Sequence, residues 1–114
     1  MTGVSLDAVW KTGAALPGVV RSTAYGSPAL KVGGQLMVCV PTNKSAEPES
    51  LMVRVDRNDR KALLDEAPDL YYVTDHYVDY DAILVRLERL KPELLHDLLA
   101  MAHRFVTKKG KRRV

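Results

Sequence analysis

The sequence offers little from which a covalent or membrane-bound framework could be built. Its 114 residues include one cysteine, Cys39, so an internal disulfide is excluded, in keeping with a reducing, cytoplasmic location. No segment approaches the roughly 20 apolar residues that span a bilayer. The N-terminus also lacks the basic start and apolar run of an export signal. We therefore expect a cytoplasmic protein that is neither exported nor embedded in a membrane.

Motifs that bind nucleotides or support catalysis are also missing. A phosphate-binding loop needs glycines, then Lys and Ser or Thr at a helix start, whereas Lys31 precedes Gly33-Gly34 and a strand is predicted next. Neither the three spaced glycines of a dinucleotide site nor a G-x-S-x-G elbow occurs. Cys39 lies in the apolar run LMVCV and is expected to be buried rather than nucleophilic. The sequence thus predicts no cofactor and favours a non-enzymatic protein.

Length and composition favour a single ordered domain. Apolar residues make up 46% of the chain and charged residues 27%, which is typical of a globular protein and not of a disordered one. A chain of this length can bury a core without disulfides or metal. We expect one domain over residues 1–107 and a basic, flexible tail over residues 108–114.

Positive charge is concentrated at the C-terminal end. The formal net charge is +3, but six of the 17 basic residues lie among the last eleven, where there is no acid, so the remainder carries 11 bases against 14 acids. A basic end of this kind attracts polyanions, although short basic ends are also common solubilising features. The basic residues concerned are Arg104, Lys108, Lys109, Lys111, Arg112 and Arg113.

Hydrophobic periodicity and turn residues predict three helices and six strands. Ser5, Asp56 and Pro92 are suited to helix starts, while Pro17 and Pro68 mark ends. Strands are predicted from β-branched or alternating apolar residues between turns. The predicted helices cover residues 5–16, 56–66 and 92–108, and the predicted strands cover residues 19–25, 29–32, 35–40, 51–55, 70–74 and 82–87.

Turn chemistry and alternation specify details of these strands. Gly33-Gly34 is typical of a two-residue hairpin turn with positive φ at both positions. Gly26-Ser27-Pro28 is predicted to turn the chain between the first two strands. Residues 51–55 alternate apolar and other side chains, which predicts a half-buried strand.

The order of elements predicts an α+β fold, α-β-β-β-β-α-β-β-α. Hairpins outnumber parallel crossovers, so we expect an antiparallel sheet of five to six strands with helices packed mainly on one face. No heptad pattern supports a coiled coil, and a monomer is favoured. The predicted core comprises Leu6, Trp10, Leu30, Met37, Val53, Leu63, Val73, Val85, Leu98 and Phe105.

The densest polar cluster, TDHYVDYD at residues 74–81, has three interpretations. His76 could join two carboxylates in a metal site, or act as an acid or base tuned by Asp75 or Asp79. It could also belong to a strand end that hydrogen-bonds to neighbouring backbone, the interpretation we favour. His96 and His103 lie seven residues apart, not at the i, i+4 spacing of zinc-binding helices, so no metal site is predicted.

Several segments in order resemble the MmcQ/YjbR family of small bacterial proteins. The resemblance rests on LPGV at 16–19, TAYGSPALKVGGQL at 23–36, LDEAPDLYYVTDHY at 64–77 and ILVRL at 83–87. It implies a compact α+β domain, comparable to frataxin-like (CyaY-like) and secretion-chaperone folds. It also implies DNA binding through a double-wing arrangement.

The resemblance can be carried over by position. Tyr25, Gly26, Pro28, Lys31 and Gly33 occupy the family's Y-G-x-P-x-x-K-V-G segment. Thr74, His76 and Tyr77 occupy its T-P-H-Y segment, with Asp75 in place of proline. Residues 78–81 also depart from it, because a glycine and a proline are usual there. Asp75 and Asp79 would weaken any phosphate contact at this surface.

Three functional hypotheses follow. A DNA-binding protein would use mainly backbone phosphate contacts, from Lys31, Arg54, Arg86 and the basic tail. A protein-interaction or chaperone-like module would present Tyr71, Tyr72, Tyr77 and Tyr80 to a partner. A ligand-binding protein or enzyme would place His76 in a concave pocket with Tyr25 and an aspartate, and a structure can test that arrangement directly.

Overall fold

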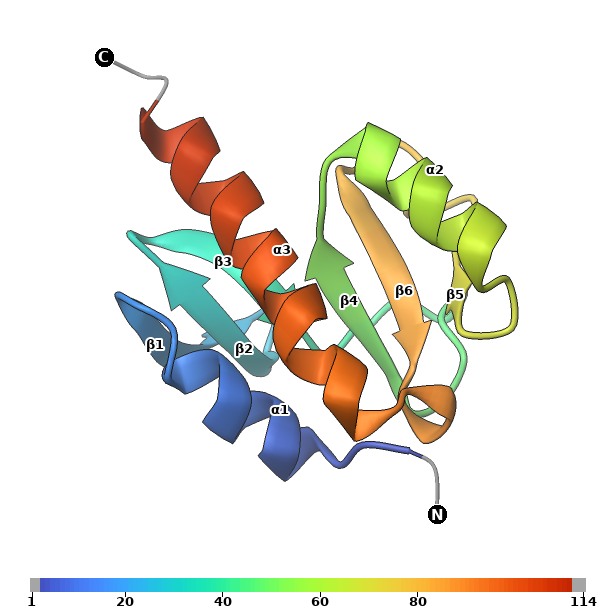
Figure 1. Cartoon of the computed structure of the whole chain (residues 1–114), viewed down its shortest axis with the longest axis horizontal. Helices are drawn as coiled ribbons and strands as arrows, with labels where there is room; N and C mark the ends of the chain where they lie inside the picture. The colour runs from blue at the N-terminus through green and yellow to red at the C-terminus, as the bar shows by residue number, and fades with distance from the viewer. Residues whose placement is uncertain (1–2, 112–114) are drawn as a thin grey trace.

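The computed structural model describes residues 3–111 and shows three helices packed against a six-stranded sheet (Figure 1). The helices are α1 (Leu6–Ala14), α2 (Arg57–Glu66) and α3 (Pro92–Lys111), with a short 3₁₀ helix η1 (Leu87–Arg89) before α3. The strands are β1 (Val19–Ala24), β2 (Ser27–Val32), β3 (Gln35–Cys39), β4 (Ser50–Arg54), β5 (Tyr71–Tyr72) and β6 (Ala82–Arg86). The predicted α+β class and element order are confirmed.

Local chemistry explains where the helices begin. The Ser5 side chain accepts a hydrogen bond from the Ala8 backbone N–H, and the Asp56 side chain accepts one from that of Asn58. Each side chain satisfies a donor that has no partner within the helix. Pro92 occupies the first position of α3, where its missing N–H costs nothing.

The sheet is antiparallel throughout, in the order β1-β2-β3-β4-β6-β5. The first four strands form a meander; α2 and β5 then intervene before β6 returns beside β4. α3 crosses the middle of the sheet, α1 lies beside it near β1 and β2, and α2 lies near β6 and β5 (Figure 1). The helices therefore cover mainly one face, as predicted.

Two tight turns connect the first three strands. Gly33 and Gly34 have φ of 58° and 78°, which confirms the predicted hairpin. The preceding turn differs from prediction, because Tyr25 and Gly26 form it, with φ of 55° and 78°, while Pro28 lies within β2 opposite Thr23. The hairpin register places Ala24 opposite Ser27, so only the two residues between them can turn.

The main core lies between the helices and the sheet. Leu30, Met37, Val53 and Val85 are fully buried there, and Leu99 reaches them from α3. All ten predicted core residues belong to this cluster or pack against it. A Cβ added to Gly13 would lie 2.3 Å from the Leu30 side chain, so α1 approaches β2 closely.

A second, smaller core lies on the other face of the sheet. It comprises Ala29, Cys39, Met52, Tyr77, Ala82 and Leu84. β4 is consequently buried on both faces, and the prediction of a half-buried strand at 51–55 is wrong. The alternation misled because loops, rather than solvent, cover the face that carries Met52.

Two further boundaries differ from those predicted. The strand expected at 70–74 pairs only at Tyr71–Tyr72, after which the chain enters turns. α3 continues to Lys111, so the segment expected to be a tail from residue 108 begins as helix, while residues 112–114 lie outside the described residues. Within the described part of the chain, no helix is long and apolar enough to cross a bilayer.

Candidate functional site

A pocket of about 600 Å³ opens on the sheet face opposite the helices. Pockets that bind small molecules commonly have volumes of this size. We call it the sheet-face pocket. Its lining residues are Tyr25, Leu36, Cys39, Pro41, Thr42, Asn43, Met52, Arg54, His76, Tyr77, Tyr80, Asp81 and Ala82.

The pocket combines an apolar floor with an aromatic wall. Cys39, Met52 and Ala82 belong to the second core and form the floor. His76 clusters with two tyrosines of the same loop: its ring centroid is 4.7 Å from that of Tyr77, edge-on, and 5.9 Å from that of Tyr80, and the two tyrosine centroids are 6.2 Å apart. An apolar base with aromatic side walls suits a planar ligand.

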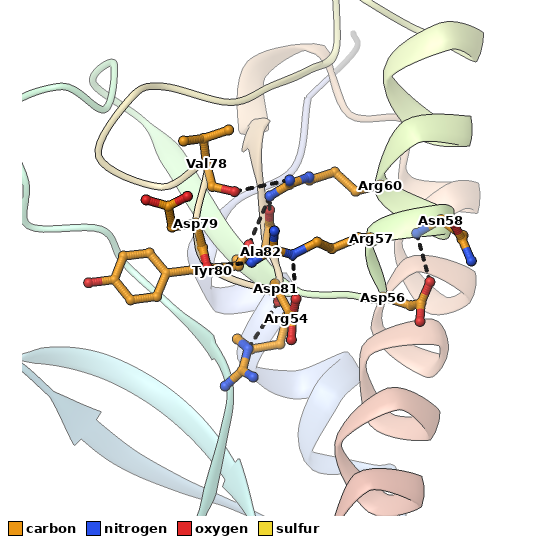
Figure 2. Close-up of polar contacts among 10 residues, drawn as sticks. All are labelled: Arg54, Asp56, Arg57, Asn58, Arg60, Val78, Asp79, Tyr80, Asp81 and Ala82. Carbon is orange, nitrogen blue, oxygen red and sulfur yellow. Dashed lines mark hydrogen bonds and ion pairs between the residues drawn. The ribbon is translucent and has the colours of Figure 1, made fainter.

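Three arginines hold residues 78–82, the end of the loop that carries His76, Tyr77 and Tyr80 (Figure 2). From α2, Arg60 donates to the carbonyl oxygens of Tyr80 (2.8 Å), Val78 (3.1 Å) and Ala82 (3.2 Å). Arg57 donates to the Asp81 carboxylate at 2.8 Å and to the carbonyl of Asp79. The Tyr80 ring points away from these arginines, so they fix the loop without blocking the ring.

The third arginine of Figure 2, Arg54, comes from β4 and also lines the pocket. Its Nε donates to the Asp81 carbonyl at 3.0 Å, and its guanidinium lies 5.6 Å from the centre of the Phe105 ring on α3. Arg54 thus stands at the boundary between pocket and helix layer. Its planar guanidinium carries donors in addition to Nε.

The start of the same loop is tied to the loop between β3 and β4. Thr74 Oγ1 lies 2.8 Å from Ser45 Oγ, and the Tyr77 N–H donates to the Thr74 carbonyl at 2.9 Å. The Asn43 backbone N–H donates a hydrogen bond to the Tyr77 phenol oxygen, which links the two loops again. These contacts explain why Thr74 suits its position.

Burial controls the titration of two groups in the pocket. Desolvation raises the pKa of the Cys39 thiol to about 11, so the thiol stays protonated and a poor nucleophile at neutral pH. Burial also raises the pKa of the Tyr77 phenol, and the Asn43 hydrogen bond opposes that shift. Both groups therefore present neutral surface to the pocket.

Tyr25 occupies the pocket rim in an unfavourable backbone conformation. Its φ of 55° lies in the left-handed region, which bulky side chains rarely adopt, and its residue surface is 83% exposed. Packing therefore offers little compensation for the strain. Strained residues of this kind concentrate at functional sites.

Among the candidate phosphate-binding arginines, Arg86 is engaged within the fold. Its guanidinium binds both carboxylate oxygens of Glu47, at 2.9 and 2.8 Å, and lies 4.4 Å from the centre of the Tyr72 ring. It also donates to the carbonyl of Asp69 at 3.1 Å. The Arg86 side chain is only 22% exposed, so it anchors the sheet edge.

The other candidate cations lie in two places. Lys31 pairs with Leu36, which lines the pocket, and is two residues from Ala29 of the second core, so its position faces the pocket side. Lys108 is exposed on α3. Lys109 and Lys111 belong to the same helix, and Arg112 and Arg113 lie outside the described residues.

The family-motif positions separate into two groups. Gly26 and Gly33 form turns, Pro28 lies in β2 and Thr74 joins two loops. Tyr25, His76 and Tyr77 line the pocket, together with Asp81. The structure therefore shows the arrangement of His76 and Tyr25 with an aspartate in a concave pocket that the ligand-binding hypothesis required.

Sequence reasoning missed Arg57 and Arg60 as supports of the site. Their i, i+3 spacing does place both on one face of α2, but nothing in the sequence shows that this face meets loop 78–82. Two of the four tyrosines proposed as a partner surface are buried, Tyr71 at 6% and Tyr77 at 8% exposure. Tyr72 is half-buried, and Tyr80 is 53% exposed.

Across residues 3–111, no three His, Cys, Asp or Glu side chains are grouped so that they could hold a metal ion. The Asp81 carboxylate that lines the pocket is paired with Arg57, and His76 contacts the two tyrosine rings. The chemistry that the pocket offers is thus stacking, apolar contact and hydrogen bonding.

Comparisons with known proteins agree with the fold. The crystal structure of Deinococcus radiodurans protein DR2400, which carries a DUF419 domain, has a TM-score of 0.75 and 23% identity to this chain. The match covers 93% of this chain and 80% of that protein. No curated protein matches the sequence. The YjbR family model matches residues 14–105, most of the chain, and the protein belongs to the YjbR family.

Proposed function

We propose that the protein is a non-enzymatic, ligand-binding member of its family that takes a planar small molecule into the sheet-face pocket. The supporting observation is the convergence of Tyr25, His76, Tyr77 and Tyr80 on one pocket with an apolar floor. These side chains come from a strained hairpin turn and from a loop fixed by arginines, so the wall is preorganised. A preorganised wall reduces the entropy cost of binding.

The state of the polar groups favours binding over catalysis. The Cys39 thiol, with its pKa raised to about 11, is in its unreactive form. The Asp81 carboxylate is held by Arg57 at 2.8 Å and is engaged within the fold. We therefore propose a role in which the protein captures or presents a ligand, in the cytoplasm, without transforming it.

A fragment screen followed by NMR tests the proposal. The ¹⁵N-labelled full chain is mixed with a panel of planar heteroaromatic fragments. Amide shifts are expected at Tyr25, His76 and Tyr80, and they should weaken in a His76→Ala variant but not in a His96→Ala control on α3. Fragments that shift only amides outside the pocket, or none that bind at all, would refute the proposed function.

DNA binding is a second candidate, favoured by the basic end of α3. Arg104 and Lys108 are exposed, and the helix continues to Lys111 beyond the edge of the sheet (Figure 1). Because Arg86 is engaged by Glu47, phosphate binding would fall to this helix end, to Lys31 and to Arg54. Such binding would be electrostatic and independent of DNA sequence.

A salt titration with a labelled duplex tests this second candidate. Arg104→Gln with Lys108→Gln should weaken binding and reduce the salt slope by about 0.9 for each phosphate that the protein no longer neutralises. A matched control replaces Lys11 and Lys61, exposed lysines that pair with acids four residues away. No binding at low salt, or equal weakening in the control, would exclude a specific role for the helix end.

A further inference from the structure

Two cations lie toward one end of the sheet-face pocket. In the register of β3 and β4, Val38 pairs with Val53 and Cys39 with Met52. Leu36 therefore lies toward the end of β4 that carries Arg54, and Lys31 is paired with Leu36 from β2. Arg54 thus lines this end of the pocket, and Lys31 flanks the same end beside Leu36.

The acid that lines this end, Asp81, is paired within the fold. Arg57 holds its carboxylate at 2.8 Å and also donates to the backbone carbonyl of Asp79. Of the Arg54 donors, Nε is used in the bond to the Asp81 carbonyl. The guanidinium has four further N–H donors, a number that suits bidentate binding of a carboxylate or phosphate.

We propose that the ligand is a planar aromatic ring bearing an anionic group, a carboxylate or a phosphate, with the ring against His76 and Tyr80 and the anion at Arg54 and Lys31. This inference rests on the proposed function, because it assigns a ligand class to the same pocket. The chemistry is shared by free aromatic acids and by nucleotides, so the test must separate these sources.

Indole-3-acetate and indole-3-acetamide make a matched pair, because they share a ring and differ in charge. Calorimetric titration of the full chain is expected to show at least ten-fold tighter binding of the acetate. Arg54→Gln should remove most of that preference and Arg54→Lys should restore part of it. Arg21→Gln is the control: its guanidinium also lies near an aromatic ring, 6.0 Å from the centre of Trp10, but it does not line the pocket.

Equal binding of the acetate and the amide would overturn the anion inference while leaving the pocket as a ring-binding site. Binding of neither probe, together with fragment hits in the pocket, would also overturn it. Failure of the whole fragment panel would instead refute the proposed function itself. Thymidine and thymidine 5′-monophosphate form the second arm. A preference for the monophosphate over thymidine that exceeds the preference for the acetate over the acetamide would identify a nucleotide as the source, and a smaller preference would identify a free aromatic acid.

Discussion

Replacement of Tyr25 by Asn should stabilise the protein and weaken its binding of a planar ligand. Tyr25 and Gly26 form the two-residue turn between β1 and β2, and both have positive φ. Asn-Gly is the pair most favoured in such turns, because Asn tolerates the left-handed conformation that disfavours tyrosine. If stability had determined this position, Asn would be the better residue.

The magnitude follows from conformation and exposure. A bulky residue in the left-handed region costs roughly 1 kcal/mol or more. With 83% of its surface exposed, Tyr25 buries only about 30 Å², which contributes at most about 0.8 kcal/mol, and Asn retains part of it. The net gain is about 0.5 kcal/mol, or about 2 °C in Tm for a chain of this length.

Differential scanning calorimetry and the fragment titration measure the two effects together. Tyr25→Phe is the first control, since it keeps both the ring and the strain and should change Tm little. Gly26→Ala is the second: an added Cβ meets nothing within 4 Å, so its cost of about 1 kcal/mol is purely conformational. A Tyr25→Asn variant that is less stable than the parent, or one that binds fragments as tightly as the parent, would refute the reasoning.

Further predictions concern the supports of the site and its titrating groups. Arg60→Met should leave three loop carbonyls without their donor, increase hydrogen exchange in loop 78–82 at least ten-fold and weaken fragment binding; unchanged exchange would contradict the proposed support. Cys39 has a pKa of about 11 against an ordinary 9.0, so at pH 8 its smaller thiolate fraction alone should make it react with iodoacetamide about 100-fold more slowly than a free thiol. Unfolding in urea should restore the reaction rate of a free thiol. The same shift should make stability fall as pH rises from about 9 to 11, because the unfolded state releases the thiol proton first, and a Cys39→Ala variant should lose the part of this fall that the thiol causes. The hydrogen bond from Arg86 lowers the pKa of Glu47, so its contribution to stability is present above the ordinary carboxyl pKa and disappears as pH falls through the lowered value; Glu47→Gln should destabilise at pH 7, with the difference vanishing in acid.

The fold was largely accessible from the sequence because local signals agreed with one another. Ser5, Asp56 and Pro92 begin helices as their chemistry requires, and Gly33-Gly34 forms the turn that its pair of glycines predicts. The first turn was misplaced because Pro28 is a strong turn residue by itself, yet here it is accommodated within β2. Register, which local propensity does not encode, determined that outcome.

The site was less accessible because it is assembled from distant segments. The motif positions Tyr25, His76 and Tyr77 come from separate segments, and their convergence depends on the order of strands in the sheet. Arg86 shows the same limit. No local signal predicts its pairing with Glu47, which lies 39 residues earlier and is brought to it by the β3–β4 loop.

A crystallographic fragment screen of the full chain tests the central claim most directly. The account predicts planar fragments bound in the sheet-face pocket, against the rings of His76 and Tyr80, with acidic fragments directing their anionic group to Arg54. Fragments found repeatedly at other surfaces, with the pocket empty at the same concentrations, would contradict it.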